Sequence, residues 1–146
     1  MKALLTALSL ALVASLAHAQ NTPVGLWKTI DDDGKTEKSV VRIFEEGGAV
    51  FGRIEQIFAE KDRNANCEKC SDERKGKPVL GMLIIRNLKQ DSGDQTLWSG
   101  GDILDPNDGE VYKTRLRPIE GGKRLEVRGY IGAPLFGRTQ TWVRIQ

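Results

Sequence analysis

GLW at Gly25–Trp27 begins the apolar part of the chain, and TQTWVR at Thr139–Arg144 nearly ends it. A Gly-x-Trp on a first strand and an Arg on a last strand are typical of a small barrel closed at one end. The indole of Trp27 would cover that end, and the guanidinium of Arg144 would stack on it, a contact worth roughly 0.5–2 kcal/mol. Gly25 would leave room for the ring. The two stretches therefore predict that the first and last strands pair. A Trp on an ordinary strand is the alternative interpretation.

Short β-type runs alternate with turn residues along the rest of the chain. The expected strands after the first are 39–46, 49–58, 78–86, one that begins at 96, 110–119, 124–131 and 138–145. We expect 78–86 to be buried on both faces and 87–94 to be a turn. Residues 99–101 should interrupt their strand as a bulge or a barrel corner. About eight strands at short spacing, with no helix, favour a barrel or a sandwich. We predict a small antiparallel up-and-down β-barrel.

The first 19 residues have the three parts of a secretory signal peptide. Met1-Lys2 is positively charged, 3–16 is a short apolar run, and Ala17–Ala19 is an Ala-x-Ala cleavage site. The apolar run is shorter than the roughly 20 residues that a membrane-spanning helix needs. We therefore expect an exported periplasmic protein without stable membrane insertion, whose single domain is 20–146.

The composition excludes several classes of function. Without the signal peptide the chain has 21 bases and 20 acids, so a general nucleic-acid binder is not expected. The single histidine, His18, lies in the signal peptide. Mechanisms that pair Ser or Cys with His, and the His-rich sites of catalytic zinc, are therefore closed to the mature chain. We find no catalytic motif and predict a protein that is not an enzyme, although paired carboxylates could still carry acid–base chemistry.

Cys67 and Cys70 form a Cys-x-x-Cys pattern within 59–77, a long polar stretch. In an exported protein a structural disulfide is the first interpretation. Redox chemistry and metal binding remain alternatives, but a redox site needs a helix N-terminus and zinc needs two more ligands. The same stretch has part of a calcium-loop pattern, from Asp62 to Glu73, with Cys67 where the turn needs Gly. We therefore predict no metal site and no cofactor.

The last strand supplies the main candidates for ligand binding. If Trp142 and Arg144 face inward to meet Trp27, the alternation of a strand brings Arg138 and Gln140 inward as well. An inward Arg needs a carboxylate or an anionic ligand. Candidate carboxylates are Glu55, Asp102 and Glu126.

A series of motifs in the same order resembles domain-of-unknown-function family 2147, a group of exported bacterial proteins. The motifs are Gly25 and Trp27, Gly52 and Ile54, Pro78 with Gly81 and Met82, Trp98 with Gly100 and Gly101, Asp105 and Pro106, Gly109 with Tyr112, Arg128–Tyr130, and Gly137–Gln140 with Trp142. The resemblance implies a lipocalin-like (calycin) barrel in the periplasm, and it implies no reaction. Arg128 and Tyr130 join Arg138, Gln140 and Trp142 as candidate ligand-binding residues.

The sequence leaves two candidate functions, which belong to different classes. The first is a non-catalytic barrel that binds a small anionic or amphipathic molecule. The second is a cell-envelope module for protein–protein interaction, with a filled barrel and a working surface such as 59–77. An open interior with convergent polar groups favours the binding barrel. No oligomeric state is predicted.

Overall fold

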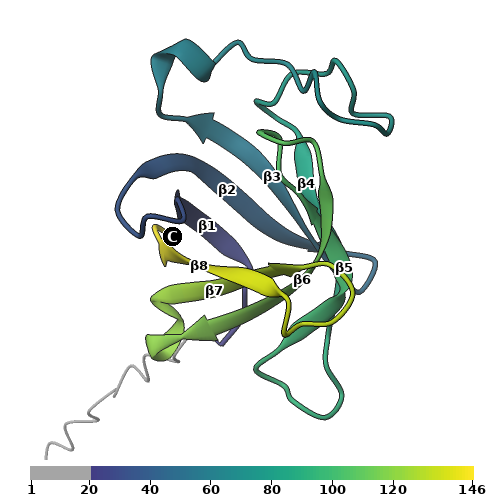
Figure 1. Cartoon of the computed structure of the whole chain (residues 1–146). Coiled ribbons are helices and arrows are strands. Elements are labelled where there is room, and N and C mark those ends of the chain that lie inside the picture. The colour runs from purple at the N-terminus through teal and green to yellow at the C-terminus, as the bar shows by residue number, and fades with distance from the viewer. Residues whose placement is uncertain (1–20) are drawn as a thin grey trace, which may run out of the picture.

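The protein is a closed barrel of eight antiparallel strands, each paired with the next in the chain (Figure 1). The computed structural model describes residues 21–146, so the expected signal peptide lies outside the described residues. The strands are β1 (Gly25–Ile30), β2 (Glu37–Glu46), β3 (Ala49–Ile57), β4 (Leu83–Gln90), β5 (Trp98–Leu104), β6 (Val111–Ile119), β7 (Arg124–Tyr130) and β8 (Gly137–Arg144). Two short 3-10 turns, η1 (Glu60–Asp62) and η2 (Glu120–Gly122), complete the elements. The predicted up-and-down barrel is confirmed.

The barrel closes where β1 meets β8. Trp27 lies opposite Arg144, and Lys28 lies opposite Val143. The backbone N–H of Leu26 also donates to the carbonyl of Gln146 at 2.8 Å. The pairing of the first and last strands, predicted from GLW and TQTWVR, is therefore confirmed.

Trp27 and Arg144 seal one end of the barrel. The indole is fully buried, and its N–H donates to the carbonyl of Pro23 at 2.7 Å. The guanidinium lies 4.1 Å from the centre of the indole ring. It donates to the carbonyls of Thr22, Val24 and Gly122 at 2.6, 2.8 and 2.5 Å respectively. Burial lowers the pKa of the guanidinium, and the three carbonyl dipoles compensate the charge.

Gly25 is required at this seal because of a close approach. A Cβ at position 25 would lie 2.4 Å from the carbonyl oxygen of Gln146 and 2.5 Å from Nη1 of Arg144. The φ of Gly25 is +144°, which side-chain-bearing residues rarely adopt. The Gly of GLW therefore makes room for the arginine and the C-terminal backbone, where we had expected it to make room for the ring.

The connection between β3 and β4 corrects two sequence predictions. We expected a strand over 78–86, but 78–82 forms a turn, and β4 begins at Leu83. Gly81 has a φ of +85°, and its N–H donates to the carbonyl of Ile54. The strand then extends over the first part of the expected turn 87–94 and ends at Gln90, so that only 91–94 forms the turn. Asn87, with a φ of +61°, makes the strand irregular without ending it.

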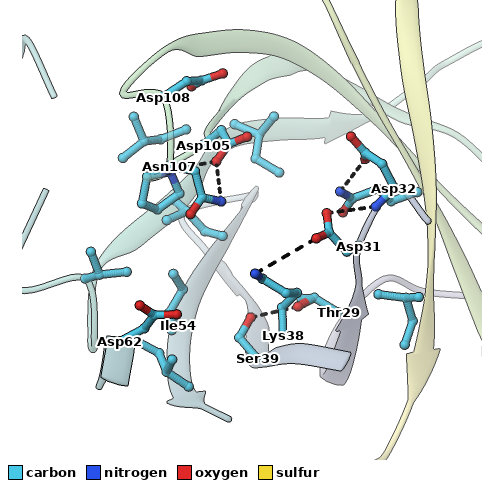
Figure 2. Close-up of a pocket in the computed structure, with 18 of the residues that line it drawn as sticks. Thr29, Asp31, Asp32, Lys38, Ser39, Ile54, Asp62, Asp105, Asn107 and Asp108 are labelled. Carbon is cyan, nitrogen blue, oxygen red and sulfur yellow. Dashed lines mark hydrogen bonds and ion pairs between the residues drawn. The ribbon is translucent and has the colours of Figure 1, made fainter. Parts of the chain in front are cut away.

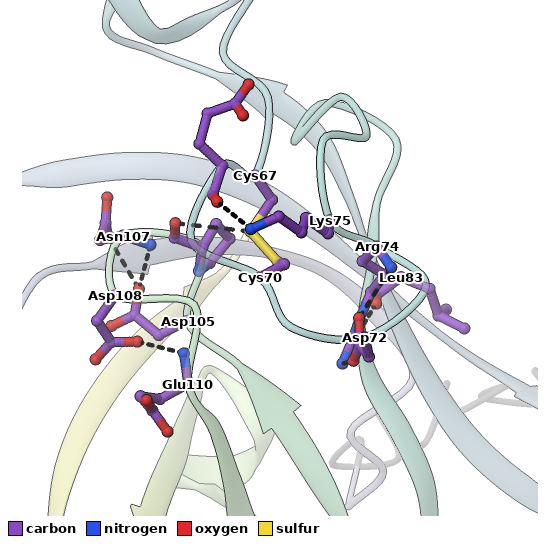
Figure 3. Close-up of a disulfide and its surroundings, with 12 residues drawn as sticks. Cys67, Cys70, Asp72, Arg74, Lys75, Leu83, Asp105, Asn107, Asp108 and Glu110 are labelled. Carbon is purple, nitrogen blue, oxygen red and sulfur yellow. Dashed lines mark hydrogen bonds and ion pairs between the residues drawn. A yellow bond between two sulfur atoms is a disulfide. The ribbon is translucent and has the colours of Figure 1, made fainter.

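A disulfide joins Cys67 and Cys70 within this long connection, as predicted. Both residues are buried. The disulfide lies beside the turn between β5 and β6 (Figure 3). A Cβ on Gly109 in that turn would lie 2.0 Å from the carbonyl oxygen of Lys69, so Gly109 allows the two loops to touch.

Replacing both cysteines by Ala should cost only about 2 kcal/mol of unfolding free energy, because the closed loop is short. Urea unfolding of the oxidised protein and the double variant measures the difference. A loss of cooperative unfolding in the variant would contradict this, because it would mean that the disulfide holds the barrel itself together.

Arg74 is a buried cation in the same connection, with only 5% of its surface exposed. It donates to both carboxylate oxygens of Asp72, the closest at 2.6 Å, and to the carbonyl of Leu83 at 2.9 Å. The hydrogen bond from Arg74 lowers the pKa of Asp72 from 3.8 to about 2. The interaction ties the connection to the start of β4.

Because the pKa of Asp72 is lower in the folded state, its stabilisation is complete above pH 4 and is lost as the pH falls toward 2. Asp72→Asn should remove roughly 1 kcal/mol of stability at pH 7 after solvent screening, and less at pH 2. Thermal melts between pH 2 and pH 7 test this, with Glu46→Gln as the control. Parallel curves for the wild type and Asp72→Asn would contradict the assignment.

Candidate ligand-binding cavity

A cavity of about 770 Å³ occupies the end of the barrel opposite Trp27 (Figure 2). Three connecting segments form its rim: β1–β2, the first part of β3–β4, and β5–β6. The inner faces of the strands form its wall. Rim residues include Asp31, Asp32, Thr36, Ala59, Lys61, Asp62, Ala65, Asn66, Asp105, Pro106, Asn107 and Asp108. The volume falls in the range of small-molecule sites.

The wall of the cavity is apolar because inward positions of β3, β4, β5 and β7 carry branched side chains. Ile54, Ile57, Ile84, Ile103 and Val127 all line it. Since the mouth is polar and the wall is apolar, the cavity presents two chemically different zones along the barrel axis.

The predicted inward face of β8 is present in the structure. Trp142 is buried, and its indole N–H donates to Oε1 of Gln140 at 3.0 Å. Nε2 of Gln140 donates to Oδ1 of Asp32 at 2.8 Å, and Arg138 follows toward the mouth. A chain of polar contacts therefore runs from the core to the rim. Arg138 and Gln140 line the cavity, whereas Trp142 lies beneath it.

Arg138 joins two sides of the mouth. It donates to Oδ2 of Asp32 at 2.9 Å and to Oδ2 of Asp105 at 2.8 Å. Its guanidinium lies 5.7 Å from the centre of the Tyr112 ring. The bridge connects the β1–β2 and β5–β6 loops through β8, and it leaves the charge of Arg138 compensated by two carboxylates.

The carboxylates that we predicted as partners of this arginine are wrong. Glu55 pairs instead with Arg42, and Asp102 lies next to Arg86 on the outer face. Glu126 alternates with the buried Val127 and therefore also points outward. The actual partners come from turns, whose side-chain directions strand alternation does not determine.

The mouth carries more negative than positive charge. Its carboxylates are Asp31, Asp32, Glu37, Asp62, Asp105 and Asp108, and its cations are Lys38, Lys61 and Arg138. Figure 2 shows Asp31, Asp32, Asp105 and Asp108 around the opening, with Lys38 reaching toward Asp31 at 3.9 Å. From the sequence we placed no candidate site residue in the turns 31–34 and 105–109. Their runs of Asp were the available signal for an acidic site.

Tyr112 contributes a neutral hydroxyl group near the rim. It donates to Oδ2 of Asp108 at 2.7 Å. This hydrogen bond, reinforced by burial, raises the pKa of Tyr112 to about 12. The phenol therefore remains protonated at neutral pH and acts as a fixed donor to Asp108.

Arg128 and Tyr130 do not line the cavity, in contrast to our prediction. On β7 the inward positions belong to Leu125, Val127 and Gly129, so the residues between them face outward. Arg128 donates to the carbonyl of Pro134 at 2.7 Å and to Oγ1 of Thr139 at 2.8 Å. The apolar alternation of Leu125 and Val127 could have revealed this orientation.

Residues 21–146 contain neither a metal-binding cluster nor a membrane-spanning helix. In this part of the chain no group of three or more His, Cys, Asp or Glu residues is placed to hold a metal ion. Glu73, the last position of the calcium-like pattern, pairs with Arg86. Within the same residues, no helix has both the length and the apolar character that a membrane crossing requires.

Comparison with known proteins supports the fold. The structure is similar to that of protein HP1028 from the human pathogen Helicobacter pylori, which is described as belonging to the lipocalin family. The TM-score is 0.71 and the sequence identity 18%, over 84% of this chain and 82% of that chain. At this identity the likeness shows a common lipocalin-like fold. No curated protein sequence matches the chain. Residues 25–144 match the family described as "Uncharacterized protein conserved in bacteria (DUF2147)", and the chain therefore belongs to this family.

Proposed function

We propose that this protein is a non-catalytic binding protein that holds a small amphipathic molecule in the open end of its barrel. The observation that carries the proposal is the cavity of about 770 Å³, with an apolar wall and a polar mouth. Pockets of this size and composition bury most of the surface of a small ligand. The lipocalin-like fold, which the chain shares with a solved structure, supports the same role.

An amphipathic ligand fits the cavity better than a purely anionic one. The positive charge of Arg138 is already compensated by Asp32 and Asp105. An anion would have to displace one of these carboxylates and would still meet the others at the mouth. A head group that is positively charged, or that donates hydrogen bonds, complements the carboxylates directly. We therefore propose a cationic or hydrogen-bond-donating head group at the rim and an apolar body against the isoleucines.

We further propose that the single domain, 20–146, works in an extracytoplasmic compartment. The disulfide between Cys67 and Cys70 supports this, because disulfides persist in oxidising compartments. The signal-peptide pattern in 1–19 supports the same location. The alternative function, a protein–protein interaction module, implies a filled barrel. The cavity argues against a filled barrel.

The proposal is tested by displacement of a neutral fluorescent probe, N-phenyl-1-naphthylamine, from the purified protein. Competitors with the same twelve-carbon chain differ only in the head group: trimethylammonium, maltoside and carboxylate, each kept below its micelle concentration. We expect the ammonium and maltoside compounds to displace the probe about 10-fold more effectively than the carboxylate, because each unfavourable or favourable charge contact at the rim is worth about 1 kcal/mol.

Arg138→Gln provides the matched control for the head-group assignment. It removes one cation from the mouth, so it should strengthen the preference for the ammonium compound. If the carboxylate binds best to the wild type and loses affinity in Arg138→Gln, the mouth is an anion site and the assignment is wrong. If the probe does not bind at all, the binding function itself is wrong.

A further inference from the structure

The loop between β7 and β8 exposes large apolar side chains at the rim of the barrel. Ile131, Leu135 and Phe136 are 66%, 80% and 72% exposed. The apolar loop, 131–136, lies between Gly129 and Arg138, both of which line the cavity. A soluble protein rarely exposes such residues together unless they meet a partner.

The exposure of this loop is maintained by specific contacts. Arg128 donates from Nε to the carbonyl of Pro134 at 2.7 Å and from Nη2 to the carbonyl of Leu135 at 3.3 Å. The N–H of Phe136 donates to the carbonyl of Ala133 at 3.0 Å, which closes a turn. The backbone is thus fixed from the barrel side, and the side chains of Leu135 and Phe136 are left pointing into solvent.

Behind the apolar loop the outer surface of the barrel is basic. Lys113 on β6 lies opposite Tyr130 on β7, and Arg115 on β6 lies opposite Arg128 on β7. Within residues 21–146 none of these three cations takes part in an ion pair. Two carboxylates share this face: Asp102 lies between Lys113 and Arg86, and Glu126 lies opposite Arg117.

Tyr130 adds an aromatic ring between the apolar and the basic zones. The guanidinium of Arg115 lies 5.8 Å from the centre of this ring, and its Nε is buried without a hydrogen-bond partner in the described part of the chain. Apolar residues at the tip, an aromatic ring next to them and cations behind them follow the order of zones at a lipid surface, from acyl chains through the interface to phosphates.

We propose that the apolar loop and the three cations behind it form a docking surface for a bilayer that contains anionic phospholipids. Leu135 and Phe136 enter the boundary between headgroups and acyl chains, and Lys113, Arg115 and Arg128 face the phosphates. Binding of this kind is peripheral and reversible. Charge complementarity favours lipid, since the cations lack carboxylate partners. Docking would also turn the rim of the cavity toward the membrane, although it does not depend on the proposed ligand.

Vesicle flotation of the mature chain, residues 20–146, tests the proposal. Vesicles of phosphatidylcholine with phosphatidylglycerol are compared with vesicles of phosphatidylcholine alone. We expect binding to the anionic vesicles that weakens as salt is raised, and about 10-fold weaker binding for Leu135→Ser with Phe136→Ser. Lys113→Gln with Arg115→Gln should weaken binding about 25-fold, since each basic residue near the surface contributes about a factor of five.

Two control variants make the same kinds of substitution on other surfaces of the barrel. Leu80→Ser removes an exposed apolar side chain from the β3–β4 connection, and Lys89→Gln removes a cation from β4. Neither should change flotation by more than about 2-fold. Arg128 is left unchanged because it also shapes the loop. Thermal melts and probe binding of all variants should match the wild type, which separates loss of docking from loss of fold or ligand binding.

Three results would overturn the proposal. The first is an absence of binding to the anionic vesicles, and the second is equal binding by the wild type and both double variants. The third is a concentration-dependent dimer, detected by sedimentation, that Leu135→Ser with Phe136→Ser abolishes. That result would assign the apolar loop to a second copy of the chain instead.

Discussion

Replacing Trp27 by Ala is expected to lower the free energy of unfolding by about 3–5 kcal/mol, the usual cost of removing a buried aromatic side chain. The indole is fully buried at the sealed end of the barrel, where it contacts Arg144. Its removal would leave a cavity next to the guanidinium of Arg144. The guanidinium cannot move to fill this cavity, because three backbone carbonyls hold it in place. Urea unfolding, followed by far-UV circular dichroism, measures the loss.

Arg144→Met should cost about 3 kcal/mol, because it removes the stacked cation and leaves the carbonyls of Thr22, Val24 and Gly122 without their donor. A double-mutant cycle with Trp27→Ala isolates the contact between the two side chains. We expect a coupling free energy of about 1 kcal/mol. Additive losses, with no coupling, would mean that the two residues stabilise the barrel separately and do not form one seal.

Val127→Trp is expected to weaken ligand binding by about 10-fold or more, because the indole would fill part of the cavity that now accommodates the ligand. Val127 is a buried residue on β7 that lines the cavity wall. The new side chain enters existing space, so the free energy of unfolding should fall by less than about 2 kcal/mol. Titration with N-phenyl-1-naphthylamine measures the change in affinity.

The matched control is Val143→Trp, which places the same side chain on the outer face of β8, next to the buried Trp142. Probe affinity should be unchanged in this variant. If both variants bind as tightly as the wild type, the probe and its competitors bind somewhere other than the barrel interior.

The fold was predictable because its signals are local or lie at the two ends of the chain. GLW and TQTWVR predict that the barrel closes between the first and last strands, because they contain Trp27 and the arginine that stacks on it, Arg144. Alternation gave the inward face of β8 from Trp142 to Arg138. The continuous apolar run misled us in the first part of 78–86: 78–82 forms a turn in which Val79 and Met82 pack against the core, and β4 starts at Leu83.

The site was less predictable because its polar residues come from turns. Asp32 and Asp105 are 73 positions apart in the chain, and only the closed barrel brings both to Arg138. A turn gives no periodic pattern from which the direction of its side chains could be inferred. Arg128 and Tyr130 show a different error, since they were taken from a motif, whereas the neighbouring Leu125 and Val127 fix their outward direction by alternation.

Native mass spectrometry of the protein isolated from its own cell envelope tests the central claim most directly. The account predicts that a fraction of the wild-type protein carries the additional mass of a small molecule, and that this mass is lost in Val127→Trp and retained in Val143→Trp. The mass of the polypeptide alone in all three proteins, together with no probe binding by the wild type, would contradict the claim that the barrel is a ligand-binding protein.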